Sequence, residues 1–108
     1  MTAKDKTFDA LLLSAIDEAL ASLGESAKQS IYFHIEKKSG VSSSSIPVNL
    51  GEFQAGLEKI FGVGARFIEI LVMKNLYTKI GQPLEMDKDC QLEFMEYVAT
   101  AKRSYLKQ

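Results

Sequence analysis

Few side chains in this sequence could carry the chemistry that enzymes use. His34 is the only histidine and Cys90 the only cysteine. A structural zinc site needs four such ligands, and nucleophilic catalysis needs a base, a nucleophile and an orienting carboxylate close together. Cys90 lies far from His34 in the sequence, on an apolar stripe that is typical of a buried, unreactive thiol. We therefore expect a protein that is not an enzyme and that has neither a metal nor a cofactor.

His34 stands in the segment SIYFHIEKKSG, at the edge of an apolar helical stripe. The phosphoacceptor histidine of a sensor kinase usually precedes an acidic residue directly, whereas here Ile35 separates His34 from Glu36. The chain also lacks a kinase ATP-binding motif. We interpret His34 as a packing or boundary residue, and contact with a ligand or partner is the alternative.

Arg66 and Glu69 are the other candidate polar contacts. Glycine-rich turns at helix N-termini bind anions, but the segment FGVGARF lacks the third glycine and the preceding strand of a dinucleotide fingerprint. It is better interpreted as a helix end and a tight turn. Arg66 then lies in a first helical turn, where the dipole disfavours a cation, and Glu69 is its simplest partner. A carboxylate among apolar residues is expected to be partly buried, with a raised pKa.

The composition is typical of one small globular domain. The 108 residues are 46% apolar and 25% charged, which excludes gross disorder and leaves room for a single core. A net charge of −1 gives no field that favours nucleic acid or an anionic membrane. The first apolar run is interrupted by Asp17 and Glu18, so no signal peptide or membrane span is expected. Together with the lone cysteine, this pattern predicts a cytoplasmic protein.

Apolar residues recur at helical spacing between the glycines and prolines. The sequence therefore predicts an all-α fold, a single compact domain over residues 1–108, with about five helices near residues 7–23, 26–40, 50–61, 65–80 and 89–106. Thr7 is the predicted N-cap of the first helix. The serine-rich connector 40–49 is expected to be extended at Ile46, because Pro47 follows it. The helix near 65–80 is apolar on several sides, which predicts a central position.

The core is predicted to surround this central helix. Leu57, Phe61, Leu71 and Tyr77 are expected to share it. Gly56 flanks an apolar stripe, where its missing side chain would let a neighbouring helix approach closely. The last helix carries two apolar stripes, and the more aromatic one is predicted to dock on the domain: Phe94, Tyr97, Ala101 and Tyr105.

The surplus apolar residues cannot all face one small core, and they form the candidate interaction surface. Its members are Leu11, Phe33, Leu92, Met95, Ala99 and Leu106. A large apolar patch on a globular domain usually marks association. The small residue Ala99 would let two copies of the last helix pack closely in a two-fold dimer.

The stretch from Ile31 to Tyr77 resembles a family of small archaeal helical domains, the Nitrosopumilus-type output domains. The resemblance rests on IYFHIEKK, on the IP pair before the third helix and on LEKIFGVGARFIEILVMKNLY, which together span about half of the chain. No catalytic motif lies among these segments. The resemblance implies a stand-alone module that acts as a response element in archaeal signalling, and it supplies no site residues.

These observations favour a non-enzymatic interaction or signalling-output module that forms a homodimer or binds a protein partner. The alternative is a sensor that encloses a small ligand in an apolar pocket, for which Met73 and Met95 would provide an adaptable lining. Neither nucleic acid nor a membrane is an expected partner.

Overall fold

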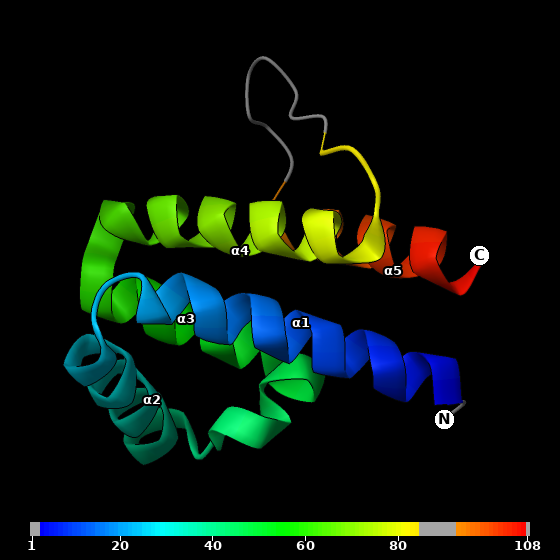
Figure 1. Ribbon diagram of the computed structural model, residues 1–108. Helices are drawn as coiled ribbons and strands as arrows, with labels where there is room; N and C mark the ends of the chain where they lie inside the picture. Colours follow the sequence, from blue (N-terminus) through cyan, green and yellow to red (C-terminus); the bar gives the residue numbers. More distant parts are fainter. Residues whose placement is uncertain (1–2, 85–92, 108) are drawn as a thin grey trace.

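The computed structural model describes residues 3–84 and 93–107, and all the regular structure in these ranges is helical. The elements are α1 (Ala3–Ala21), α2 (Glu25–Ser39), the 3₁₀ segment η1 (Ser43–Asn49), α3 (Leu50–Phe61), the short 3₁₀ turn η2 (Gly62–Gly64), α4 (Ala65–Ile80) and α5 (Phe94–Leu106) (Figure 1). The radius of gyration is 13.4 Å, close to the value of about 13 Å for a compact chain of this length. The all-α class and the single compact globule are thus confirmed.

α1 and α4 form the most extensive helix pair and lie along one another (Figure 1). Apolar residues three and four positions apart give α1 one continuous buried face: Phe8, Leu12, Ala15, Ile16, Ala19 and Leu20. α4 also packs against α3 and α5, so it buries residues on several sides: Ala65, Ile68, Glu69, Val72, Met73, Leu76, Tyr77 and Ile80. The predicted central helix is therefore found, although it shares the centre with α1.

α5 docks on this pair through the predicted aromatic stripe. Phe94, Tyr97 and Ala101 are buried, and Tyr105 packs against the core while partly buried. The Tyr77 hydroxyl donates a hydrogen bond to the Tyr97 backbone carbonyl at 2.8 Å, which links α4 to α5. The Tyr97 hydroxyl is itself buried and has no hydrogen-bond partner in the described part of the chain.

Three residues depart from the predicted core and surface. Leu57 and Tyr77 are buried as expected, but Leu71 is only partly buried. Phe61 is exposed, because it is the last residue of α3, where Gly62 turns the chain at a φ of 59°. Leu11 was expected on the interaction surface, yet it packs against the core while partly buried.

The helix starts and the connector also differ from the prediction. α1 begins at Ala3, so Thr7 lies inside the helix and donates its hydroxyl to the Ala3 carbonyl at 2.9 Å. The connector is helical rather than extended, since the 3₁₀ segment η1 carries Ile46 into the core. Pro47 fits there because its fixed φ suits a short helical turn. Residues 85–92, which include Cys90 and Leu92, lie outside the described ranges.

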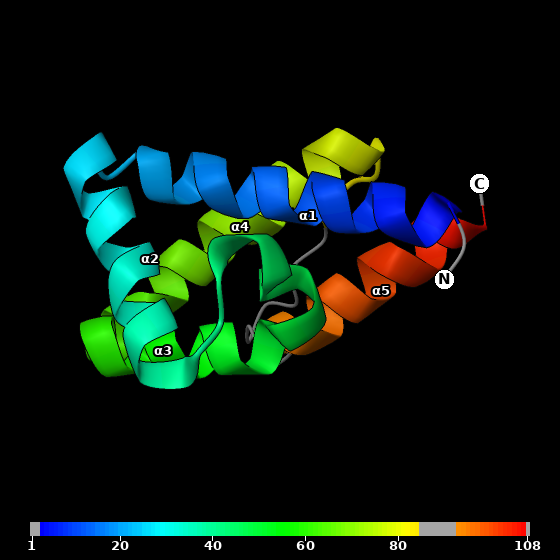
Figure 2. The ribbon, with the colours of Figure 1, turned by 90° about the horizontal axis from the view of Figure 1, so that it is seen from below.

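Different helices meet at the two ends of the molecule, and different polar contacts join them. Both termini lie at one end, with α2 and the turn from α3 to α4 at the other (Figures 1 and 2). At the terminal end, the Lys4 ammonium donates to the Leu106 carbonyl at 3.5 Å and Lys102 lies 3.7 Å from Asp5. At the other end, the Tyr32 hydroxyl donates to the Asp17 carboxylate at 3.1 Å and holds α2 on α1.

The two buried tyrosines of the α4–α5 contact should respond differently to loss of the hydroxyl. Tyr77→Phe removes a hydrogen bond and is expected to lower the free energy of unfolding by about 1 kcal/mol. Tyr97→Phe removes a buried hydroxyl without a partner and should leave stability unchanged or raise it by about 1 kcal/mol. Urea denaturation of both variants tests this, and a larger loss for Tyr97→Phe than for Tyr77→Phe would contradict the packing described.

Candidate functional site

The turn between α3 and α4 exposes four large apolar side chains, here called the corner patch: Ile60, Phe61, Val63 and Phe67. Val63 is 98% exposed and Phe67 is 64% exposed. Val63 stands on η2 between two glycines, and the chain bends there before any neighbouring element can cover it. Phe67 lies on α4 next to the buried Ile68 and faces away from the core. These four side chains are therefore exposed apolar groups close to one turn of the chain.

The charged residues around the corner patch include both signs. Glu58 and Glu69 line an open hollow there together with Arg66 and Val63. One Arg66 guanidinium nitrogen lies 3.9 Å from a Glu69 carboxylate oxygen, so the two candidate polar contacts do come together. This separation is long for an ion pair, and the attraction is correspondingly weak.

Glu69 is the one buried charged residue in the described ranges. Burial raises the pKa of its carboxyl, and the negative charge of Glu58 raises that pKa further. A hydrogen bond from the Gln54 side chain and the positive charge of Arg66 oppose these effects without cancelling them. Glu69 is therefore held in a position that favours its neutral form.

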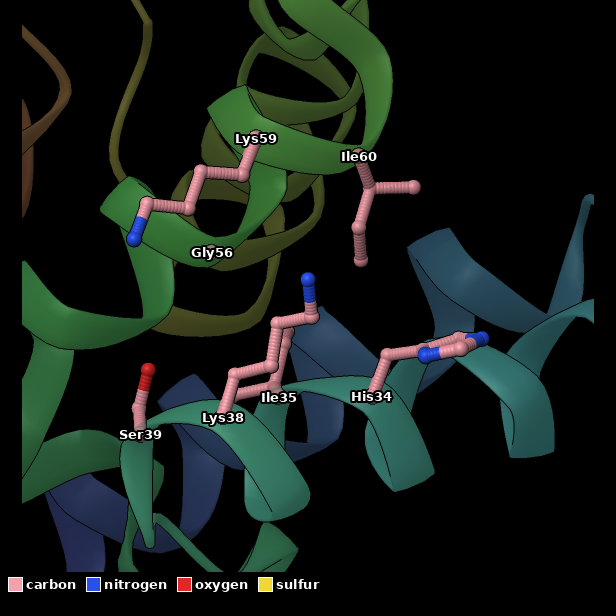
Figure 3. A pocket seen from close by; sticks show the side chains of 7 residues that line it. All are labelled: His34, Ile35, Lys38, Ser39, Gly56, Lys59 and Ile60. Atoms are coloured by element: carbon pink, nitrogen blue, oxygen red, sulfur yellow. The ribbon is translucent and has the colours of Figure 1, made fainter.

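A second concave feature lies between α2 and α3 (Figure 3). This α2–α3 pocket has a volume of about 260 Å³ and is lined by His34, Ile35, Lys38, Ser39, Gly56, Lys59 and Ile60. A β-carbon at position 56 would lie 3.0 Å from Cγ1 of Ile35. The predicted close approach at Gly56 is thus found, because any larger residue there would require the Ile35 side chain to shift.

His34 belongs to the rim of this pocket. Its side chain lies on α2, and its ring is 5.8 Å from the ring of Phe33 in an edge-on arrangement. Phe33 is 60% exposed, and the Lys37 ammonium lies 5.7 Å from its ring centre. His34 and Phe33 are thus neighbours on the exposed side of α2, away from Arg66 and Glu69 on α4.

The predicted surface of the last helix forms a third feature. Met95, Ala99 and Leu106 are all exposed on α5. Met95 and Ala99 line an open groove with Val48 of η1 and the start of α3. Met73, in contrast, is fully buried in the core. The residues predicted to form one surface are therefore divided between α2 and α5, and Leu92 lies outside the described residues.

The sequence does not predict the corner patch, because helical periodicity places Phe61 in the core. The signal that could have revealed it is Val63 between Gly62 and Gly64, since a side chain between two glycines in a tight turn has no helix face on which to pack.

No protein family matches the chain, and no curated protein or solved structure matches it significantly. In the described ranges, no group of three or more His, Cys, Asp or Glu side chains is arranged to hold a metal ion. No helix of residues 3–84 or 93–107 is both long and apolar enough to cross a membrane.

Replacing Glu69 with glutamine should stabilise the protein in a pH-dependent way. A carboxyl whose pKa is raised in the folded state favours folding at low pH, and that contribution is lost as the pH rises from the ordinary value of 4.5 through the raised pKa. Glu69→Gln cannot ionise, so its advantage over the wild type should grow with pH across this window.

Chemical denaturation of both proteins at acidic and neutral pH measures this difference. Glu52→Gln removes an exposed α3 carboxylate and controls for the loss of one negative charge. A Glu69→Gln variant that is less stable than the wild type at neutral pH would mean that the attraction to Arg66 outweighs burial.

Proposed function

We propose that this protein is a non-enzymatic interaction module that self-associates through the corner patch. The observation that carries the proposal is Val63, an aliphatic side chain that is 98% exposed at the turn whose flanking helices also expose Phe61 and Phe67. Large apolar groups gathered on one surface of a small domain are typical of a contact with another protein. Covering them would remove apolar area from water, which drives most protein association.

The charges around the patch favour a second copy of the same chain as the partner. In a two-fold contact each copy presents the same surface, so a rim of one sign would repel itself. Here the hollow beside Val63 is lined by the exposed Glu58 and by Arg66, so both signs are present. A rotated copy can therefore place acidic groups near basic ones, and a net charge of −1 adds little repulsion.

The α5 face is the weaker candidate for the dimer contact. Met95 and Leu106 are each 38% exposed, far less than Val63 or Phe67. Met95 also lies in a groove beside η1 rather than on a projecting surface. The turn from α3 to α4, which carries Val63, lies at the end of the molecule opposite the termini (Figure 2).

The wider role that we propose is signalling output. Its support is the resemblance of the segments IYFHIEKK and LEKIFGVGARFIEILVMKNLY to archaeal output domains. Cytoplasmic location is part of the same proposal, and the single cysteine supports it because secreted domains of this size usually contain disulfides.

Sedimentation velocity and light scattering over a concentration series test the self-association. The wild type should become dimeric within a concentration series that reaches about 1 mM. Val63→Asp would place an unpaired charge in the buried contact, and it is expected to weaken the dimer by about tenfold or more. The helical circular-dichroism signal should persist, because Val63 makes almost no contact within the monomer.

Two control variants locate the contact. Val48→Asp changes an exposed valine on η1, and Met95→Glu changes the α5 face; both should remain dimeric. A wild type that stays monomeric throughout the series overturns the proposal. Dissociation by Met95→Glu but not by Val63→Asp would instead place the contact on α5.

A further inference from the structure

The α2–α3 pocket has two positive groups and no negative ones among its lining residues. Lys38 and Lys59 line it together with the uncharged-polar or apolar remainder, and no aspartate or glutamate is among them. This local composition departs from the chain as a whole, whose net charge is −1. A pocket of this kind attracts anions, and its walls reduce the screening by water that weakens charge interactions at an open surface.

The two pocket lysines also differ from other lysines of the structure. Lys28, Lys79 and Lys102 each lie within ion-pair distance of a carboxylate. In the described part of the chain, neither Lys38 nor Lys59 makes a salt bridge, and both are exposed. Their ammonium groups are thus available to an incoming anion, without breaking an ion pair to another described residue.

The remaining lining is mainly apolar. Ile35 and Ile60 face the pocket from opposite helices, and Gly56 contributes a bare stretch of backbone. Figure 3 shows Lys38 extending from α2 between the helices, with Lys59 and Ser39 on one side and Ile60 and His34 on the other. Lysine has a long flexible stem, so both ammonium groups can turn toward one ligand above the isoleucines.

We propose that the α2–α3 pocket binds a small amphipathic anion, a single carboxylate attached to a short apolar chain. The carboxylate would lie between Lys38 and Lys59, within reach of the Ser39 hydroxyl, and the apolar chain would lie against Ile35 and Ile60. The volume of about 260 Å³ is at the small end for ligand pockets, which favours a short chain. This binding goes beyond the proposed self-association and does not depend on it.

A series of ligands tests whether the wild-type protein recognises both the carboxylate and the apolar chain. Hexanoate is the probe, and its binding is followed by the amide NMR shifts of His34, Ser39 and Gly56, with an expected dissociation constant of about 1 mM or tighter. Hexan-1-ol lacks the charge and acetate lacks the chain, so each should bind about tenfold more weakly or not measurably. Absence of saturable hexanoate shifts at these residues, or equal binding of either control compound, overturns the proposal.

A matched pair of variants, each lacking one α2 lysine, tests the charge contact. Lys38→Ala should weaken hexanoate binding by about tenfold or more. Lys37→Ala removes the neighbouring α2 lysine, which lies over Phe33 and does not line the pocket, and it should bind hexanoate like the wild type. Equal losses in both proteins would show a general charge effect and contradict the site. Repeating the titration with Val63→Asp separates ligand binding from self-association.

Discussion

The packing of α1 against α4 is the contact on which the other elements depend. Their sequences are far apart, yet the Asn75 side chain donates to the Ala15 carbonyl at 3.2 Å and Lys79 lies 3.0 Å from Glu18. Ala15 and Ala19 are fully buried small residues, so the two backbones can approach closely. Once this pair forms, the chain between them must leave the end of α1 and return to the start of α4. The segment α2–η1–α3 makes that excursion, and this places both the α2–α3 pocket and the corner patch at the same end of the molecule.

Much of the fold follows from helical periodicity. The apolar positions of residues 65–80 indicate a helix covered on several sides, and the aromatic stripe of the last helix indicates the face that docks. The features that were missed depend on contacts between distant residues. Asp5 lies near Lys102, and Lys4 donates to the Leu106 carbonyl of α5. These contacts stabilise a first helical turn that starts before Thr7, the predicted N-cap. Ile46 is buried in the core, and this burial stabilises the helical turn of the serine connector, which Pro47 also fits.

The candidate sites were harder to predict, because periodicity gives the apolar faces of a helix but not the neighbour that each face meets. Phe61 continues the α3 stripe in the sequence, yet the helix ends there and the ring stays exposed. Leu11 breaks the α1 stripe, yet it packs against the core. Gly56 did indicate a close helix approach. No sequence pattern indicates that Lys38 and Lys59 line the same pocket, since they come together only when α2 folds onto α3.

The location of both termini at one end affects the shape of any assembly formed through the other end. Two copies joined at their corner patches would have their chain ends at opposite extremes, and the particle would be longer than the 36 Å extent of one molecule. Fluorophores attached at the C-terminus would then be widely separated and transfer energy poorly. The α5 helices of the two copies would also stay apart, and tags or surface attachment at either terminus would lie at the far end of each copy from the dimer contact.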